Sequence, residues 1–326
     1  MSAVVVFDRL GGPEVLHRVE EEPRAPRAGE VLVRMEAFAV NPLDAMLRTG
    51  ALPAPVRLPH ARTGVEGTGI VENVGEGVDG FAPGDPVLVT AVPDADARGV
   101  AAEHATLPAA TLIHRPAGLD VIEAAAVWVG FSTAYGALVE VAGLRAGDAV
   151  LVTGATGAVG RAAVQVAARL GAHPIAITRD AAKADALRDV GADAVVVSGR
   201  DDLPAAVREH TGGAGADVVL DLVRGPGQQD LLAAARTGGV LIEAGFLDPR
   251  PTPEPADDRV RVIGYRGFDL LADRAAVSRM ATFLEEGVAD GGLLPAVGHV
   301  LDLDHVVEAH QLLDSGAGSG KIVVRV

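Results

Sequence analysis

The fold is decided by the stretch Val150-Leu-Val-Thr-Gly154-Ala-Thr-Gly157-Ala-Val-Gly160. An apolar run leads into three glycines spaced G-x-x-G-x-x-G, and Val159–Leu170 then shows the apolar periodicity of a helix. Glycine lets the backbone turn tightly and approach a pyrophosphate, while the free N–H groups of a helix N-terminus attract its charge. The sequence therefore predicts a dinucleotide site whose contacts are Gly154, Ala155, Thr156, Gly157, Ala158, Val159 and Gly160.

Strands and helices alternate on either side of this turn. The predicted strands are 149–153, 174–178, 194–197, 217–221 and 240–244, and the predicted helices are 121–141, 159–170, 181–190, 203–210 and 273–286. Apolar strands between amphipathic helices predict a parallel sheet covered on both faces. Upstream of Asp120, short apolar runs bounded by Gly and Pro predict a compact β domain instead, and Gly320–Val326 is expected to return to it as a strand.

Composition excludes several classes of protein. The chain has 326 residues, 49% of them apolar, and a formal net charge of −16, which disfavours nucleic acid and anionic membranes as partners. It has no cysteine, so disulfides, thiolate nucleophiles and cysteine-ligated zinc are excluded. No secretory signal is recognised, and the longest uncharged stretch, Ala124–Val139, is shorter than the about 20 residues that span a bilayer. We expect a buried helix there and a cytoplasmic protein.

The end of the second predicted strand favours one nicotinamide cofactor over the other. NAD sites place an acidic residue there to bind the ribose hydroxyls. Here the strand ends in Thr178, and Arg179 and Lys183 follow as candidates to neutralise a 2′-phosphate. Asp180 argues the other way, and a solvated basic face is the alternative interpretation. The prediction is NADPH.

The order of short motifs along the chain resembles the medium-chain dehydrogenase/reductase superfamily, and within it the zinc-free quinone oxidoreductase branch. The motifs that carry this resemblance are Gly11-Gly12-Pro13-Glu14-Val15-Leu16, Asn41-Pro-Leu-Asp44, Gly64-x-Glu66-x-x-Gly69, Gly84-Asp85, Thr133-Ala134-Tyr135, the glycine turn and Gly320-Lys321-Ile-Val-Val324. The resemblance implies an α/β protein with a GroES-like β-barrel domain (1–121 and 293–326) and a Rossmann domain with a doubly wound parallel sheet (122–292).

The resemblance also implies the chemistry. The motif Asn41-Pro-Leu-Asp44 stands where the alcohol-dehydrogenase branch has its first zinc-binding cysteine, and Gly64-Val65-Glu66 stands where that branch has Gly-His-Glu, so no metal is expected. Without a Lewis acid, hydride transfer suits acceptors that are already electron-poor, such as quinones and α,β-unsaturated carbonyl compounds. An enoyl-thioester reductase and a non-catalytic NADPH-binding protein, structural or sensing, remain the alternatives. The family also implies a homodimer.

Individual roles follow from the same resemblance. Asn41, Asp44 and Thr133 are expected near the nicotinamide, although a loop cap and a satisfied helix hydroxyl are the plain alternatives. Ser198 is a candidate for the 2′-phosphate. The remaining candidates are Gly245 and Phe246 beside the nicotinamide, and Met46, Tyr265 and Phe268 in the substrate pocket. Glu66 is expected to be structural and to pair with an arginine.

Overall fold

The computed structural model describes residues 1–90, 92, 94–255, 258–316 and 319–326. The chain divides into two compact units, Met1–Val129 with Pro295–Val326 and Gly130–Leu294. The division that we expected after residue 121 lies at the first residue of helix α3 (Val121–Tyr135), whereas the observed division falls inside that helix.

The second unit contains a parallel sheet in the strand order β11-β10-β9-β12-β13-β14 among its described residues. Strand β9 comes first in sequence among the strands of this sheet and lies in its interior. The next strands are added on one side of β9 and the later ones on its other side, as in doubly wound dinucleotide-binding sheets. The predicted parallel sheet is confirmed. Its strands are β9 (Ala149–Val152), β10 (His173–Thr178), β11 (Ala194–Val197), β12 (Ala216–Asp221), β13 (Ala235–Glu243) and β14 (Arg261–Gly264).

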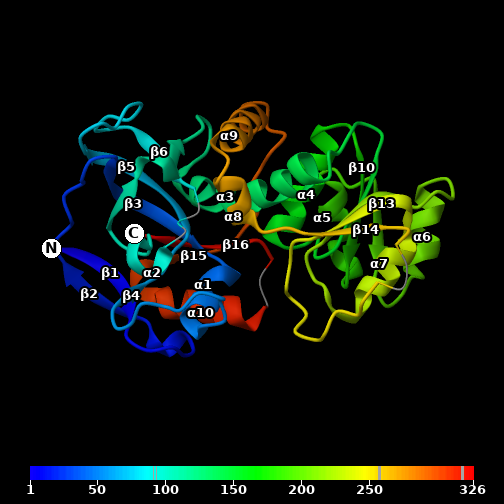
Figure 1. The fold of residues 1–326 in the computed structure, drawn as a ribbon, viewed down its shortest axis with the longest axis horizontal. Helices are drawn as coiled ribbons and strands as arrows, with labels where there is room; N and C mark the ends of the chain where they lie inside the picture. The colour runs from blue at the N-terminus through cyan, green and yellow to red at the C-terminus, as the bar shows by residue number, and fades with distance from the viewer. Residues whose placement is uncertain (91, 93, 256–257, 317–318) are drawn as a thin grey trace. The chain divides into compact units, whose positions relative to one another are not determined.

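Helices connect these strands, and those between β9 and β13 lie against the sheet (Figure 1). Helix α4 packs on β9 and β10, whereas α6 and α7 pack on each other and on the strands beside them. The helices are α4 (Ala158–Arg169), α5 (Ala184–Arg188), α6 (Leu203–His210), α7 (Gln228–Ala234), α8 (Gly267–Leu271) and α9 (Arg274–Ala289), with 3₁₀ turns η4 (Ala181–Lys183) and η5 (Gly225–Gly227).

The helix predicted over 121–141 is present but is not uniform. After α3 the chain widens into a π-helical segment, η3 (Gly136–Val141), in which the Ala142 N–H donates to the Ala137 carbonyl. By length and composition the 21 residues Val121–Val141 would suffice to cross a membrane, contrary to what the uncharged stretch alone suggested. However, 72% of the most apolar window is buried inside the structure, as in the core helix that we expected.

The first unit is built mainly on antiparallel β-sheet, although β15 and β16 pair in parallel. One sheet has the order β15-β16-β3-β5-β6-β8, with β7 also paired to β3, and a smaller sheet has the order β2-β1-β4. The strands are β1 (Ser2–Phe7), β2 (His17–Glu21), β3 (Glu30–Val40), β4 (Ala61–Arg62), β5 (Glu66–Val74), β6 (Pro86–Val89), β7 (His104–Pro108), β8 (Leu112–His114), β15 (Val297–Asp302) and β16 (Lys321–Arg325). The helices are α1 (Pro42–Thr49), α2 (Ala95–Arg98) and α10 (Val306–Ser315), and the 3₁₀ turns are η1 (Pro13–Val15), η2 (Ala109–Thr111) and η6 (Leu303–His305).

The C-terminal strand completes this unit. β16 pairs antiparallel with β3, with Val324 opposite Phe38, which confirms the expected return of the chain to its N-terminal domain. Val323 is fully buried with Ala37 and Ala39 in one apolar cluster. Residues from both ends of the chain are therefore needed to form one core.

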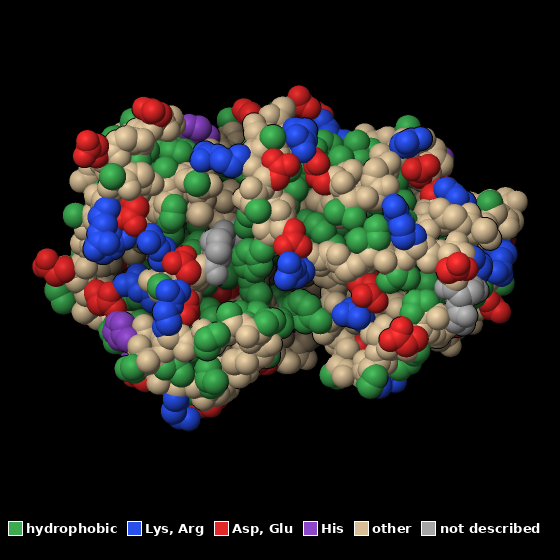
Figure 2. All heavy atoms as spheres, viewed as in Figure 1, with side chains coloured by type: hydrophobic (Ala, Val, Ile, Leu, Met, Phe, Trp, Pro, Cys, Tyr) green, Lys and Arg blue, Asp and Glu red, His purple; other side chains and the backbone are tan. Residues whose placement is uncertain are grey.

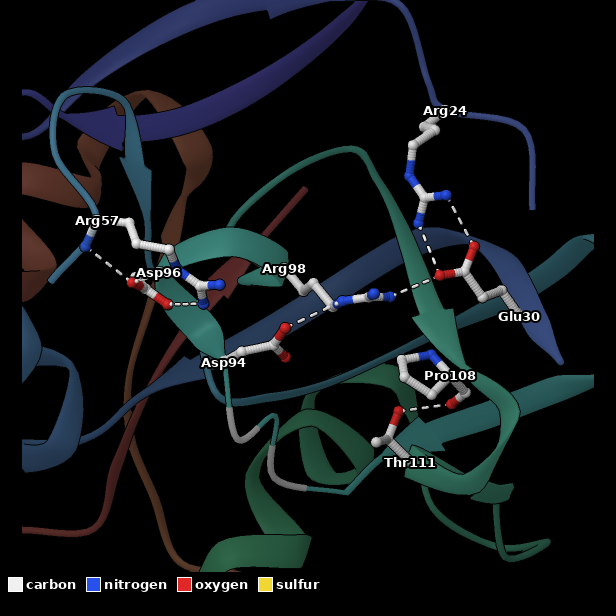
Figure 3. A network of polar contacts seen from close by, with 8 residues as sticks. All are labelled: Arg24, Glu30, Arg57, Asp94, Asp96, Arg98, Pro108 and Thr111. Carbon is white, nitrogen blue, oxygen red and sulfur yellow. Dashed lines mark hydrogen bonds and ion pairs between the residues drawn. The ribbon is translucent and has the colours of Figure 1, made fainter. Parts of the chain in front are cut away.

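Arginine–carboxylate pairs tie the loops of the first unit to its sheet (Figure 3). Arg24 donates two hydrogen bonds to Glu30, at 2.8 and 3.0 Å, and Arg98 bridges Glu30 at 2.8 Å to Asp94 at 3.1 Å. The Arg24 guanidinium is the main cause that lowers the pKa of Glu30 to about 2. Figure 2 shows basic and acidic side chains intermingled on this part of the surface, so the arginines are largely neutralised where they stand.

Candidate functional site

The glycine turn lies between β9 and α4, at the carboxyl edge of the parallel sheet. Gly154 has a φ of 57°, in the left-handed region that favours glycine. Gly157 is the N-cap of α4, and the first turn of this helix contains no acidic side chain. The N–H groups at the start of a helix have no intrahelical acceptor, so this end of α4 is suited to an anion.

Close packing explains the third glycine. A Cβ on Gly160 would lie 2.3 Å from the Gly154 carbonyl oxygen and 2.6 Å from the Ala155 Cα, so a side chain there would displace the turn. A Cβ on Gly157 would meet only the Gly154 oxygen, at 3.4 Å. The turn is therefore held tightly against α4, while its outer face keeps the backbone accessible, which fits a dinucleotide pyrophosphate.

The residues after β10 are arranged as a basic rim. The hydroxyl of Thr178 donates to the Asp180 carbonyl at 3.2 Å, and the Asp180 carboxylate accepts from the Ala182 N–H at 3.0 Å. Arg179 and Lys183 form no ion pair or side-chain hydrogen bond within the described part of the chain. The acidic residue thus acts as a helix cap, and the two cations are left available.

Neighbouring strands bring the other expected contacts to the same edge. Ser198 follows β11, and its N–H donates to the Thr178 carbonyl at 2.9 Å. Gly245 lies two residues after β13 and packs tightly against Leu222, because a Cβ on it would lie 1.8 Å from the Leu222 carbonyl oxygen. Phe246, the next residue, is half-exposed. These residues lie where ligands bind in open parallel sheets.

Thr133, Tyr265 and Phe268 form a second group within the same unit. A Cβ on Gly267 would lie 3.4 Å from the Thr133 hydroxyl, so α8 begins beside α3. Tyr265 is only 8% exposed, and its hydroxyl lies against Gly136 with no hydrogen-bond partner among the described residues. Burial raises the pKa of this hydroxyl. Phe268 is half-buried on the first turn of α8.

A buried polar cluster occupies the first unit. The Lys321 ammonium, on β16, donates to the Asn41 side-chain oxygen and to the Glu66 carboxylate. The Asn41 amide in turn donates to Glu66 at 3.1 Å, and the Val129 N–H donates to the other Glu66 oxygen at 2.7 Å. The expectation that Glu66 pairs with an arginine is wrong, because the partner is Lys321.

Asp44 lies in the third position of α1 and is fully buried. Its carboxylate accepts from the Asn41 N–H at 2.8 Å, the Thr63 hydroxyl at 3.0 Å and the Gly64 N–H at 2.8 Å. Burial nevertheless raises the pKa of this carboxyl. Asn41 and Asp44 therefore hold α1 to the sheet, and contact with a nicotinamide stays a prediction for both, while Met46 is half-buried on the same helix.

Two family models match the two parts of the chain. Residues 27–117 match the alcohol dehydrogenase GroES-like domain, and residues 158–286 match the zinc-binding dehydrogenase model. Over 328 residues the chain is 30% identical to the quinone oxidoreductase of Lama guanicoe, which covers 99% of this chain and 97% of that protein. The chain belongs to the medium-chain dehydrogenase/reductase superfamily, in its quinone oxidoreductase branch. As a member of this superfamily it is an oxidoreductase with a GroES-like and a Rossmann-type domain.

Other members of the superfamily match along the whole chain. An Escherichia coli quinone oxidoreductase solved with NADPH has a TM-score of 0.89 and 26% identity, covering 99% of this chain and 100% of its own. An NAD-dependent alcohol dehydrogenase has the same TM-score, 33% identity and complete coverage of both chains. A segment of an erythronolide synthase of Saccharopolyspora erythraea is 36% identical over 91% of this chain, which corresponds to 8% of that synthase.

Despite the name of one family model, no group of three or more His, Cys, Asp or Glu side chains in the described part of the chain is arranged to hold a metal ion. The residue that sequence reasoning missed is Lys321, as the partner of Glu66. The one local signal for it was a lysine directly before the apolar run Ile322–Val324.

Proposed function

We propose that this oxidoreductase uses NADPH to reduce quinones or α,β-unsaturated carbonyl compounds without zinc. The observation that carries the proposal is the rim after β10, where Arg179 and Lys183 are without partners in the described residues and Asp180 is used as a cap. A 2′-phosphate would supply the missing charge. The E. coli relative solved with NADPH supports this choice, and the NAD-dependent alcohol dehydrogenase is the counter-example.

The residues have distinct proposed roles. The N–H groups from Gly154 to Gly160 hold the pyrophosphate, while Thr178, Arg179, Lys183 and Ser198 hold the 2′-phosphate. Within the second unit, Gly245, Phe246 and Thr133 are assigned to the nicotinamide, and Tyr265 and Phe268 to the acceptor. In the first unit, Asn41 and Asp44 are the proposed catalytic residues and Met46 is a proposed acceptor contact. The cofactor supplies the hydride, and the protein supplies binding and orientation.

Lys321 supports a mechanism without zinc. Its ammonium is buried and bonded to Asn41 and Glu66, which occupy two positions where the zinc-dependent branch concentrates its ligand motifs. A divalent cation placed beside a buried ammonium would be strongly repelled. We therefore propose that the acceptor must be electron-poor before hydride arrives, as quinones and enones are.

The proposal is tested with purified protein, NADPH and a panel of quinones and enones, with NADPH consumption followed by absorbance. Arg179→Gln with Lys183→Gln should raise the Kd for NADPH by about tenfold or more and leave the Kd for NADH nearly unchanged, since each charge-assisted bond contributes about 1.5–3 kcal/mol. Equal affinity of the native protein for NADH would contradict the cofactor assignment. Absence of turnover with every acceptor would contradict the activity.

An enoyl thioester is the second candidate acceptor. The chain is 36% identical to the erythronolide synthase segment and 30% identical to the Lama guanicoe quinone oxidoreductase, so an acceptor class other than quinones is tested beside them. Adding an enoyl thioester beside the matching enone decides between the two. A higher kcat/KM for the thioester than for the enone would identify the protein as an enoyl-thioester reductase. Tight NADPH binding with no turnover would indicate a structural or sensing protein.

We also propose a cytoplasmic homodimer, as the family resemblance implies. Strand β14 is the edge of the parallel sheet and pairs only with β13 among the described strands, so one edge is available for a second copy. Light scattering after size-exclusion chromatography should give twice the 33.2 kDa chain mass. A monomer at micromolar concentration would contradict this assignment.

A further inference from the structure

Lysine is almost absent from this chain. Of its 28 Lys and Arg residues only Lys183 and Lys321 are lysines, and the structure describes both. The two kinds of cation differ in their chemistry, because a guanidinium stays charged whereas a lysine amine loses its charge on acylation. The chain also has no cysteine. Its two lysine amines and a free N-terminal amine are therefore the groups that form a stable amide with an acyl donor.

Lys321 is shielded from such a donor. It is almost fully buried, and its ammonium donates to the Asn41 side chain and to the Glu66 carboxylate. Glu66 is itself fully buried, so loss of the lysine charge would leave a carboxylate inside the protein without a counter-ion. An amine that is both buried and required as a cation does not react while the chain is folded.

Lys183 has the opposite environment. It ends the 3₁₀ turn η4 after β10 and is half-buried, and within the described residues its amine forms no hydrogen bond or ion pair. The unpaired nitrogen is not closed to solvent. The two acidic residues within three positions are engaged elsewhere. Asp180 accepts from the Ala182 N–H at 3.0 Å, and Asp185 pairs with Arg188 at 2.8 Å. The Lys183 amine is therefore accessible and is not held as a cation by these neighbours.

The position of Lys183 gives acylation a consequence for cofactor choice. Lys183 and Arg179 are the proposed partners of the 2′-phosphate, which NADPH has and NADH lacks. Acylation would convert the ammonium into a neutral amide and remove one of these two charges. The pyrophosphate, which both cofactors share, is assigned to the backbone of the glycine turn and would keep its contacts. Loss of the charge at Lys183 therefore acts on NADPH and not on NADH.

We infer that Lys183 is a site of acylation by acyl thioesters, and that this modification lowers the preference for NADPH over NADH. The inference rests on the proposed cofactor function, and thioesters are also the second class of acceptor proposed above. In the reaction the uncharged amine attacks the thioester carbonyl, a C–N bond forms and the C–S bond breaks. The thiolate leaves and takes up the proton that the amine loses, so nothing is oxidised or reduced.

The test treats the native full-length protein with acetyl-coenzyme A at pH 8 and locates the product by peptide mass spectrometry. Lys183 should be acetylated together with a free N-terminal amine, and Lys321 should react only after urea unfolds the chain. After the reagent is removed, calorimetry should give a Kd for NADPH that is raised about tenfold and an unchanged Kd for NADH. Adenosine 2′-monophosphate, which carries the 2′-phosphate without the nicotinamide half, should slow the acetylation of Lys183.

Two variants separate the loss of charge from other effects of the reagent. Lys183→Arg keeps the charge and offers no amine, so the treatment should not change its Kd for NADPH. Untreated Lys183→Gln should bind both cofactors as the acetylated native protein does. An unmodified Lys183 beside an acetylated N-terminus would overturn the inference, as would acetylation of Lys183 that leaves the ratio of the two Kd values unchanged. If the native protein bound neither dinucleotide while Lys183 was acetylated, the proposed function would fail and the acylation site would remain.

Discussion

At the scale of single residues, burial of the Lys321 ammonium carries a large cost in lost hydration. Its ammonium is 5% exposed and its partner Glu66 is fully buried, so both charges have been removed from water. Such a pair is retained only if its geometry and additional hydrogen bonds offset the loss of hydration. Asn41 and the Val129 N–H provide these bonds, and through them the last strand is fixed to α1 and α3.

Breaking this pair should therefore be costly. Lys321→Met leaves the Glu66 carboxylate buried and uncompensated, and we expect the free energy of unfolding to fall by about 3–5 kcal/mol in urea denaturation. Adding Glu66→Gln should recover part of that loss, since the stranded charge is removed. Arg325→Met, at an exposed position on the same strand, is the matched control. A single variant as stable as the control would show that the pair is not structurally important.

At the scale of elements, the contact between η3 and the end of β14 depends on Gly136. A Cβ there would lie 1.9 Å from the Tyr265 hydroxyl and 2.9 Å from its ring carbon Cζ. Gly136→Ala should lower stability by about 1–3 kcal/mol through overpacking, despite the better helix propensity of alanine. The measurement is thermal unfolding followed by circular dichroism.

Removal of the Tyr265 hydroxyl tests whether its contact with residue 136 is the reason for the glycine there. Tyr265→Phe removes a buried group that has no partner in the described structure, so alone it should cost little or even stabilise. Combined with Gly136→Ala, it should recover most of the lost stability, because the closest contact disappears. If the double variant were as unstable as Gly136→Ala alone, backbone geometry rather than this contact would explain the glycine.

Local chemistry determined which elements could be predicted. The turn between β9 and α4 was predictable because its glycines have local causes: Gly154 has a positive φ, and a Cβ on Gly157 or Gly160 would contact the Gly154 carbonyl oxygen. The π-helical segment was not predicted, and its first residue, Gly136, packs against Tyr265, which lies far along the chain. The partner of Glu66 lies 255 residues away along the chain. No local sequence pattern could show that this partner is Lys321 and not one of the arginines. The positive φ of Arg224, 66°, was not predicted, because nothing in the sequence marks a non-glycine residue with this backbone angle.

At the scale of the whole molecule, stability should depend on pH through two buried groups in the first unit. Burial, together with the nearby Arg48 guanidinium, lowers the pKa of His310 on α10 to about 3. The unfolded chain takes up this proton below about pH 6.5, so acidification favours unfolding from there down to about pH 3. The pKa of Glu30 is about 2, below its ordinary value of 4.5. Glu30 therefore contributes its full stabilisation above pH 4.5, and this contribution is lost as the pH falls from 4.5 to about 2.

The two pH ranges overlap only below about pH 4.5, so the effect of His310 can be measured by itself between pH 6.5 and 5. Over that range the native protein should lose about 2 kcal/mol through this residue, since each pH unit corresponds to about 1.4 kcal/mol. His310→Leu should flatten the pH dependence of urea unfolding there, and the exposed His299→Gln should not. The steep fall below pH 4.5 should persist in both variants, because Glu30 still pairs with Arg24 and Arg98. An unchanged slope in His310→Leu would mean that His310 is protonated in the folded protein, against the effect of its burial.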